Sequence, residues 1–321
     1  AAAAVVKGIS TGIMRASRVQ RPFVDRLDDG PMKLRDTLRA IVMHEGLNFA
    51  LTNRIARNGL TLLMGRISRI RHPLFARAAI GIWRLFTDLE LDDAATLEFD
   101  SLHACFTRAL KPGARPIDRA PDLLTSPSDG IVGACGRILD GQALQAKGMP
   151  YRLQDLLGDA DAARSFVGGS YVTLRLTSAM YHRFHAPADL LIDRVDYISG
   201  DTWNVNLPAL KRVPRLLCRN ERAAIHVRME RDGHRLALVP VAAVLVASIR
   251  LHFADVLLHL RYQGPNRIEC RHHAAKGEEL GWFEHGSTII VLAPPGFERC
   301  AGIDTGTRVR MGQALLRVPA S

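Results

Sequence analysis

The sequence predicts an α+β protein, in which N-terminal helices precede a compact, mostly antiparallel β-rich core. Two observations support this fold class. Helical signals dominate from about residue 34 to residue 110, and the last of them, SLHACFTRALKP, ends at Pro112 and Gly113. From residue 125 onward, short apolar and β-branched runs alternate with turns, which is typical of strands. A chain of 321 residues is long enough to form a substantial core.

Six runs after residue 125 have the length and composition of strands. They lie at 129–139, 170–176, 222–230, 234–241, 287–294 and 314–318. The longest clearly uncharged apolar stretch, residues 236–249, has 14 residues and contains Pro240. A membrane-spanning helix needs about 20 residues, so we interpret this stretch as buried strands.

The basic charge of the chain is concentrated in its N-terminal quarter. Residues 1–87 contain 15 Lys and Arg residues against 5 acidic residues, so they carry +10 of the formal charge of +11. Such a segment attracts either nucleic acid or anionic lipid, and its high apolar content favours lipid and argues against nucleic acid. We therefore divide the chain into a basic, amphipathic, membrane-associating helical region at 1–110 and a β-rich domain at 111–321.

The clearest amphipathic pattern lies in the second half of this helical region. Leu63, Ile67 and Ile70 follow helical spacing, whereas Arg66 and Arg69 share another face. A helix of this type can lie among lipid headgroups with its arginines near phosphates, and we predict that these five residues contact a membrane. The alternative is that the same stripe packs on the protein's own core, and both can hold on different helices.

Cysteine and histidine usage argues against a metal centre. The five cysteines are scattered and include no CxxC pair, which favours a cytoplasmic protein without a disulfide framework or a zinc site. His272 and His273 are adjacent but lack further ligand candidates nearby. We expect both to lie in a loop and to bind no metal.

A Gly-Ser-Thr triplet at 286–288 carries the first chemical signal. The Oγ atom of Ser287 lies close to the carbonyl carbon of Gly286, and once a base takes its proton, attack there converts the amide into an ester. Elimination and hydrolysis would then cut the chain and leave a pyruvoyl ketone at position 287. Such a ketone suits decarboxylation of an amino acid. A turn that leads into a strand at Thr288 explains the triplet without any chemistry.

A base and an orienting carboxylate are available elsewhere in the chain. YHRFHAP at 181–187 contains His182 and His185, and SPSDG at 126–130 places Asp129 in a turn. A Ser–His–carboxylate set needs the histidine to accept the proton of the nucleophile and the carboxylate to hold the ring in the useful tautomer. Structural roles for both histidines and a plain turn at Asp129 are the alternative.

Eight sequence blocks occur in an order that is specific to one enzyme family. They are FTRALKPGARPID (106–118), SPSDG (126–130), LQAKG (144–148), YHRFHAP (181–187), NVNLPAL (204–210), RNER (219–222), KGEELGWFEHGST (276–288) and RMGQ (310–313). From about residue 85 to the C-terminus, the chain resembles the phosphatidylserine decarboxylases of the bacterial, membrane-associated, pyruvoyl-dependent type.

The resemblance implies a role for each candidate residue. Asp129, His185 and Ser287 would form the self-processing triad, and cleavage between Gly286 and Ser287 would give a large chain, 1–286, and a small chain, 287–321, which starts with the pyruvoyl cofactor. His182 matches the family's other histidine, which is associated with decarboxylation. The small chain begins with a predicted strand, so we expect it to stay bound to the large chain.

The same resemblance implies the reaction and its location. Residues 111–321 would be the catalytic domain, converting phosphatidylserine to phosphatidylethanolamine and CO₂ on an anionic membrane surface. The protein would be peripheral, on the cytoplasmic face of the bacterial inner membrane. A homodimer is compatible with the sequence, which does not specify the oligomeric state. One departure is His285, because the family usually has an apolar residue before Gly-Ser-Thr.

Three other functions would explain part of the sequence. A soluble pyruvoyl-dependent decarboxylase of a free amino acid would share the self-processing step, but would not need the basic, apolar N-terminal helices. A non-enzymatic membrane-surface adaptor would leave the Asp, His and Gly-Ser-Thr motifs unexplained. The Gly-rich ending also resembles lipoyl and biotinyl carrier domains, but residues 287–321 contain no lysine to carry the group.

Overall fold

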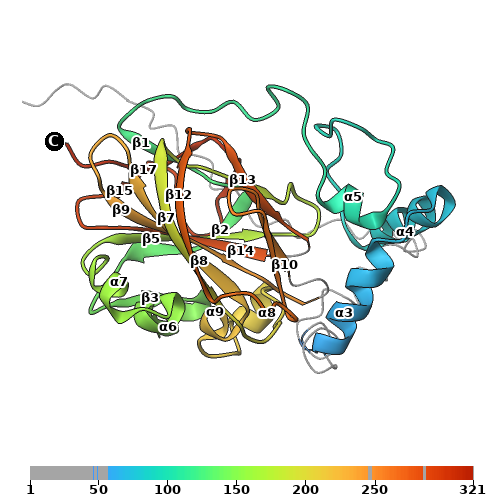
Figure 1. Cartoon of the computed structure of the whole chain (residues 1–321), viewed down its shortest axis with the longest axis horizontal. Coiled ribbons are helices and arrows are strands. Elements are labelled where there is room, and N and C mark those ends of the chain that lie inside the picture. Colours follow the sequence, from blue (N-terminus) through green and yellow to red (C-terminus); the bar gives the residue numbers. More distant parts are fainter. Residues whose placement is uncertain (1–45, 47–48, 50–56, 245–247, 285–286, 321) are drawn as a thin grey trace, which may run out of the picture. The chain divides into compact units, whose positions relative to one another are not determined.

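The computed structural model describes residues 46, 49, 57–244, 248–284 and 287–320. All of them belong to one compact unit, residues 34–321. Figure 1 shows two groups of helices around a set of strands, one beside it and one beneath it, which confirms the predicted α+β class.

An eight-stranded antiparallel sheet forms the centre of this unit, and in it β14 lies between β9 and β5. Its order is β12 (Arg267–Ala274), β7 (Leu190–Ile198), β8 (Arg222–Met229), β9 (Arg235–Val241), β14 (Ser287–Ala293), β5 (Ser170–Leu176), β2 (Gly130–Arg137) and β16 (Arg308–Val309).

Three smaller antiparallel sheets accompany it. The four-stranded sheet has the order β11 (Val256–His259), β10 (Ser248–Leu251), β13 (Glu279–Phe283) and β6 (Arg183–His185). The other two are β1 (Leu123–Thr125), β17 (Ala314–Arg317) and β15 (Glu298–Arg299), and the hairpin of β3 (Gln142–Leu144) with β4 (Pro150–Arg152).

The central sheet is buried on both faces because apolar side chains leave each strand in both directions. In β14, Ile289 and Val291 join one core, which they share with the smaller sheets, whereas Ile290 and Leu292 join a second core on the other face. Short helices cover this second face, as Figure 1 shows. They are α6 (Leu153–Leu157), α7 (Ala160–Arg164), α8 (Leu207–Leu210) and α9 (Leu216–Arg219), preceded by the 3₁₀ turn η1 (Ala146–Gly148).

The N-terminal half of the described chain contains α3 (Arg57–Ser68), α4 (Pro73–Phe86) and α5 (Leu102–Phe106). The expected helical content up to residue 110 is wrong for 87–101, which contains no helix, and for the C-terminal end of α5. Tertiary contacts explain the early end of α5. Arg108 is buried and donates to the carbonyls of Cys105, Glu90 and Ala179, which fixes the chain in a non-helical path.

All six predicted strands are confirmed by β2, β5, β8, β9, β14 and β17. Residues 236–241 of the uncharged apolar stretch lie in β9, and residue 248 begins β10, so this interpretation is confirmed at both ends. The expectation that His272 and His273 lie in a loop is wrong, because both belong to β12. Among the described residues, no helix is long and apolar enough to cross a membrane.

The segment that would become the small chain is built into two sheets. Its strand β14 is paired on both sides by β9 and β5, β16 pairs with β2, and β17 pairs with β1. Every residue of β14 is buried. A cut before Ser287 would therefore leave the segment held by backbone pairing and by core packing.

Candidate active site

Ser287 is the first residue of β14, where its backbone pairs with Leu176 of β5. Its side chain is completely buried, and within the described part of the chain its Oγ atom has no hydrogen-bond partner. The Oγ1 atom of Thr288 is unpartnered in the same way. A buried hydroxyl without a partner costs about 1–3 kcal/mol, which a purely structural serine would avoid. The fold thus keeps the oxygen of Ser287 shielded from water and available for chemistry.

His182 lies just before β6 and is completely buried. Its Nδ1 donates to the carbonyl of Met180 at 2.9 Å, because a carbonyl can only accept, and the lone pair of the neutral ring is then on Nε2. Nε2 has no partner among the described residues. Burial lowers the pKa of His182 to about 4, helped by the charge of Arg108. At neutral pH this ring is uncharged and presents a proton acceptor.

His185 ends β6, and both of its ring nitrogens are engaged. Nδ1 donates to the carbonyl of Gly277 at 3.0 Å, and Nε2 accepts the hydroxyl proton of Tyr181 at 2.9 Å. Burial lowers the pKa of His185, and the hydrogen bond to Gly277 offsets part of this effect. His185 is thus a second neutral base, but the Tyr181 hydroxyl covers its basic nitrogen.

Asp129 lies in the bend before β2 and is almost completely buried. Arg115 holds both carboxylate oxygens, with Nε donating to Oδ1 at 2.8 Å and Nη2 donating to Oδ2 at 2.7 Å. The backbone N–H of Met311 donates to Oδ1 at 2.9 Å. This carboxylate therefore links the segment that enters the catalytic domain to the segment that would become the small chain.

The structure brings the predicted acid and bases into one electrostatic neighbourhood without joining them by hydrogen bonds. The charge of Asp129 raises the pKa of His182 and of His185, although burial has the larger, opposite effect on both. The orientation of His185 by Asp129 stays a prediction, because no hydrogen bond joins the two among the described residues. Gly277 holds the ring instead, and Arg115 occupies the carboxylate.

Three groups at this site were missed by the sequence analysis as functional residues: Arg115, Tyr181 and the carbonyl of Gly277. All three lie inside blocks that carry the family resemblance, FTRALKPGARPID, YHRFHAP and KGEELGWFEHGST. The sequence could therefore have pointed to Arg115 and Tyr181, because both lie in blocks that carry the resemblance. A backbone carbonyl gives no such signal, because its position depends on the fold alone.

The family model described as phosphatidylserine decarboxylase matches residues 102–317, which contain Asp129, both histidines and Ser287. The chain belongs to the phosphatidylserine decarboxylase family. Curated relatives named phosphatidylserine decarboxylase proenzyme agree with this assignment. One from Brevibacillus brevis (strain 47) is 34% identical over 271 residues, covering 83% of this chain and 95% of the relative. One from Pseudomonas putida (strain GB-1) is 40% identical over 268 residues, covering 80% and 92%. One from Myxococcus xanthus is 33% identical over 257 residues, covering 79% and 91%.

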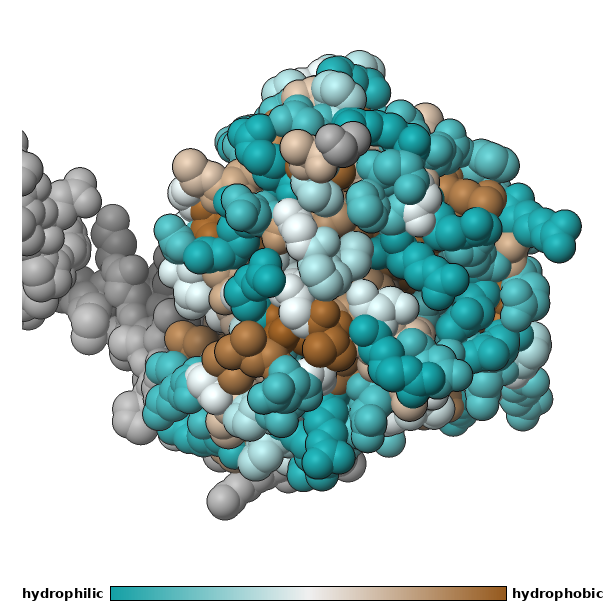
Figure 2. All heavy atoms as spheres, turned by 90° about the vertical axis from the view of Figure 1, so that its left-hand side faces the viewer, coloured by the Kyte–Doolittle hydropathy of each residue, from teal (hydrophilic) through white to brown (hydrophobic). Residues whose placement is uncertain are grey.

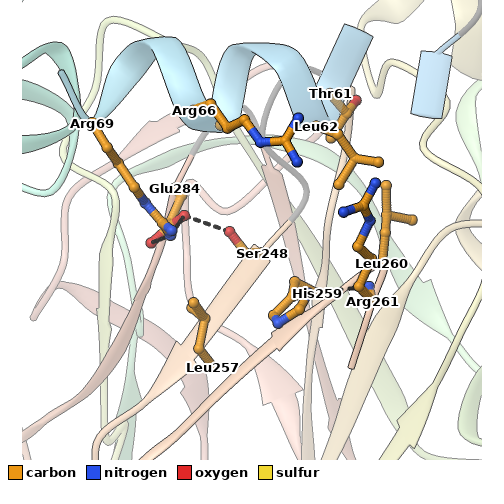
Figure 3. A pocket seen from close by; sticks show the side chains of 11 residues that line it. Thr61, Leu62, Arg66, Arg69, Ser248, Leu257, His259, Leu260, Arg261 and Glu284 are labelled. Carbon is orange, nitrogen blue, oxygen red and sulfur yellow. Dashed lines mark hydrogen bonds and ion pairs between the residues drawn. The ribbon is translucent and has the colours of Figure 1, made fainter. Parts of the chain in front are cut away.

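This phosphatidylserine decarboxylase family member has a pocket of about 440 Å³ beside the segment that carries the Gly-Ser bond. Figure 3 shows its walls, which come from α3 on one side and from β10 and β11 on the other. Glu284, three residues before Ser287, is buried in its lining. Glu284 accepts hydrogen bonds from Arg69 Nη2 at 2.6 and 2.8 Å and from Ser248 Oγ at 2.6 Å.

The residues predicted to contact a membrane fall into two groups. Leu63 and Ile70 are exposed, at 51% and 45%. Arg69 pairs with the buried carboxylate of Glu284, and its side chain is still 49% exposed. Arg66 lines the same pocket. The lipid-facing assignment of the five residues stays a prediction.

Proposed function

We propose that the chain cuts itself between Gly286 and Ser287 and then decarboxylates phosphatidylserine to phosphatidylethanolamine, with release of CO₂. The observation that carries this proposal is the buried Oγ of Ser287 at the start of a central strand, which has no partner among the described residues. Two buried, neutral histidines supply the candidate bases. The relatives' shared name, proenzyme, supports the self-processing step.

In the processing step, the Oγ of Ser287 attacks the carbonyl carbon of Gly286. The bond from that carbon to the nitrogen of Ser287 breaks, and an ester bond to Oγ replaces it. Elimination then frees the carboxylate of Gly286, and hydrolysis of the remaining dehydroalanine releases ammonia and leaves pyruvoyl at position 287. His185 is the proposed base, since its Nε2 accepts the Ser287 proton once the hydroxyl of Tyr181 has moved off it.

The surroundings of Ser287 fit a pyruvoyl group. The Oγ of Ser287 and Nε2 of His182 are buried polar atoms without a partner in the described chain, so both have unused hydrogen-bonding capacity. The pyruvoyl group would supply an electron-accepting ketone for the loss of CO₂. His182 is the proposed residue that handles the proton, at Nε2, with Met180 fixing the ring orientation. Burial of the site keeps water away from the reacting atoms.

The proposal places this chemistry at a membrane surface, and α4 supports it. Of the twelve exposed large hydrophobic side chains in the described chain, seven lie between residues 63 and 86. Five of these are on α4, and at 100° per residue they cover about one third of the helix circumference. They are Leu74, Phe75, Ile82, Leu85 and Phe86. Figure 2 shows the opposite side of the molecule, which is mostly hydrophilic with a small apolar patch.

This apolar stripe and the basic charge of residues 1–87 suit an anionic bilayer surface. We therefore propose a peripheral enzyme on the cytoplasmic face of the inner membrane. The stripe also favours a lipid substrate over a free amino acid, because a soluble decarboxylase would gain nothing from exposing it.

The test measures labelled CO₂ from phosphatidylserine carrying the label in its serine carboxyl group. Wild-type protein should release it, and Ser287→Ala should not, because no hydroxyl is left to form the ketone. Free serine with the same label is the control substrate. Release from free serine but not from the lipid would contradict the proposed substrate, and release by Ser287→Ala would contradict the proposed chemistry.

A further inference from the structure

The pocket in Figure 3 contains two arginines that the rest of the fold does not use. Arg66 reaches it from α3, and Arg261 extends toward the helix from the segment after β11. Within the described chain neither guanidinium has a carboxylate partner, because the only carboxylate in the lining, Glu284, binds Arg69 and Ser248. Two cations facing one pocket without a counter-charge form a site for an anion.

His259 adds a further donor to this pair. Its Nδ1 accepts the backbone N–H of Arg261 at 3.1 Å, so the ring carries a proton on Nε2. The ring lines the pocket together with both arginines. Guanidinium and N–H groups are the usual donors to phosphate oxygens in proteins.

Part of the remaining wall is apolar. Leu62, Leu257 and Leu260 line the same pocket, in which Arg66 and Arg261 supply the charge. An inorganic anion would gain nothing from these leucines. A phosphodiester attached to glycerol and acyl chains would contact both kinds of wall.

The pocket is also close enough to the proposed reaction centre. Glu284 belongs to its lining and stands three residues before Ser287, and three extended residues span at most about 10 Å. The amine and the phosphodiester of phosphatidylserine are only a few bonds apart. A headgroup whose amine reaches position 287 therefore has its phosphodiester near this pocket.

We propose that Arg66, Arg261 and Nε2 of His259 bind the phosphodiester of phosphatidylserine, while the leucine wall receives the glycerol end of the lipid. This inference rests on the proposed function and specifies how the substrate is recognised. It also gives a reason for discrimination against free serine, which has no phosphate to offer these donors. The Arg69–Glu284 ion pair keeps α3 against the strands and so fixes the width of the pocket.

The first experiment measures kcat and KM on dihexanoyl phosphatidylserine below its micelle concentration, where recruitment to a bilayer does not contribute. Arg66→Gln and Arg261→Gln should each raise KM about tenfold and leave kcat nearly unchanged, because a charge-assisted hydrogen bond to the substrate is lost. Arg71→Gln is the matched control. It removes a neighbouring arginine whose side chain is 82% exposed and does not line the pocket, so KM should not change.

The second experiment separates the pocket from the reaction. Titration calorimetry of dihexanoyl phosphatidylserine with the uncut Ser287→Ala protein should detect binding, and adding Arg66→Gln should weaken it about tenfold. If wild type releases no CO₂ while this binding still depends on Arg66, the proposed function fails and the pocket assignment stands. If wild type is active and neither arginine changes KM or binding, the pocket assignment is overturned. An equal effect of Arg71→Gln would also overturn it, since general surface charge would then explain the result.

Discussion

Strand β14 and helix α4 are both dominated by apolar side chains, yet β14 is buried and α4 is largely exposed. Every residue of β14 is buried between β9 and β5, with its side chains divided between two cores. In α4 only Ala76 is buried, and five large apolar side chains are exposed. Apolar sequence thus marks the protein core only where the chain supplies a partner surface. In α4 the missing partner is, on our proposal, the membrane.

Replacing an isoleucine by aspartate in each of the two elements should destabilise β14 far more than α4. Ile290→Asp would put a charge into the core, which costs several kcal/mol without a counter-charge, so folded protein should be lost. Ile82→Asp changes a side chain that is 59% exposed, and stability should fall by less than about 1 kcal/mol. Circular dichroism shows whether Ile290→Asp is folded, and urea denaturation gives the change in stability of Ile82→Asp. Loss of folded protein in both variants would show that α4 is packed as tightly as β14.

On our proposal, His185 and His182 act in different steps of the chemistry at Ser287. His185→Ala should remain a single chain, because the proposed base for cleavage is gone. His182→Ala should still be cleaved but should turn over phosphatidylserine about 10²–10⁴ times more slowly, the usual effect of losing a general acid–base. Gels and CO₂ release are measured on each variant. If His182→Ala stays uncut while His185→Ala matures normally, the two roles are reversed.

Acid should lower the free energy of unfolding through the buried ring of His182. The pKa of His182 is about 4 in the folded chain against an ordinary value of 6.5, so between these values the unfolded chain binds more protons. This contribution to stability is complete above about pH 6.5 and is lost as the pH falls toward 4. From pH 7 to 4.5, urea denaturation of Ser287→Ala should show His182→Gln losing about 2 kcal/mol less than its parent.

Glu221 supplies a control of opposite sign. Burial raises its pKa to about 7 from an ordinary value of 4.5, so the folded chain binds the extra proton and stability falls as the pH rises through this range. Glu221→Gln should therefore make the acid loss larger, whereas His182→Gln makes it smaller. Shifts in the same direction for both variants would contradict these assignments.

The smallest expected effect concerns the exposed stripe of α4. Leu74→Ser with Ile82→Ser should weaken binding to vesicles of anionic lipid about tenfold or more, because less apolar surface enters the bilayer. Leu139→Ser is the matched control, since Leu139 is as exposed as Leu74, at 68%, but lies elsewhere on the surface. Self-cleavage should proceed in all three proteins. Equal vesicle binding by the α4 variant and wild type would exclude this stripe as the lipid contact.

The sequence predicts six strands of this fold, and all six are present because their runs are rich in apolar and β-branched residues. It does not predict β7, a long strand inside the central sheet, or β12. Strand β12 is an edge strand whose exposed positions carry Arg, Glu and His, as a loop would. Helix α5 is shorter than expected because the contacts of Arg108 with Glu90 and Ala179 come from distant parts of the chain.

The candidate site can also be predicted only in part from the sequence. Motifs identify Asp129, His182, His185 and Ser287, because residue type and spacing are written in the sequence. Their hydrogen-bond partners are not, since Gly277 reaches His185 from 92 residues away and Met311 reaches Asp129 from 182 residues away. A pattern can therefore name candidate reacting groups. Only the fold shows which of their atoms already have hydrogen-bond partners.

The most direct test of the central claim is the intact mass of the purified wild-type protein under denaturing conditions. We predict two chains, residues 1–286 and 287–321, with the small one lighter by one ammonia than a peptide that starts with serine. The isolated small chain should also resist N-terminal sequencing, because pyruvoyl has no amine. A single uncut chain that still releases CO₂ from phosphatidylserine, or two chains that meet at a different bond, would contradict the account.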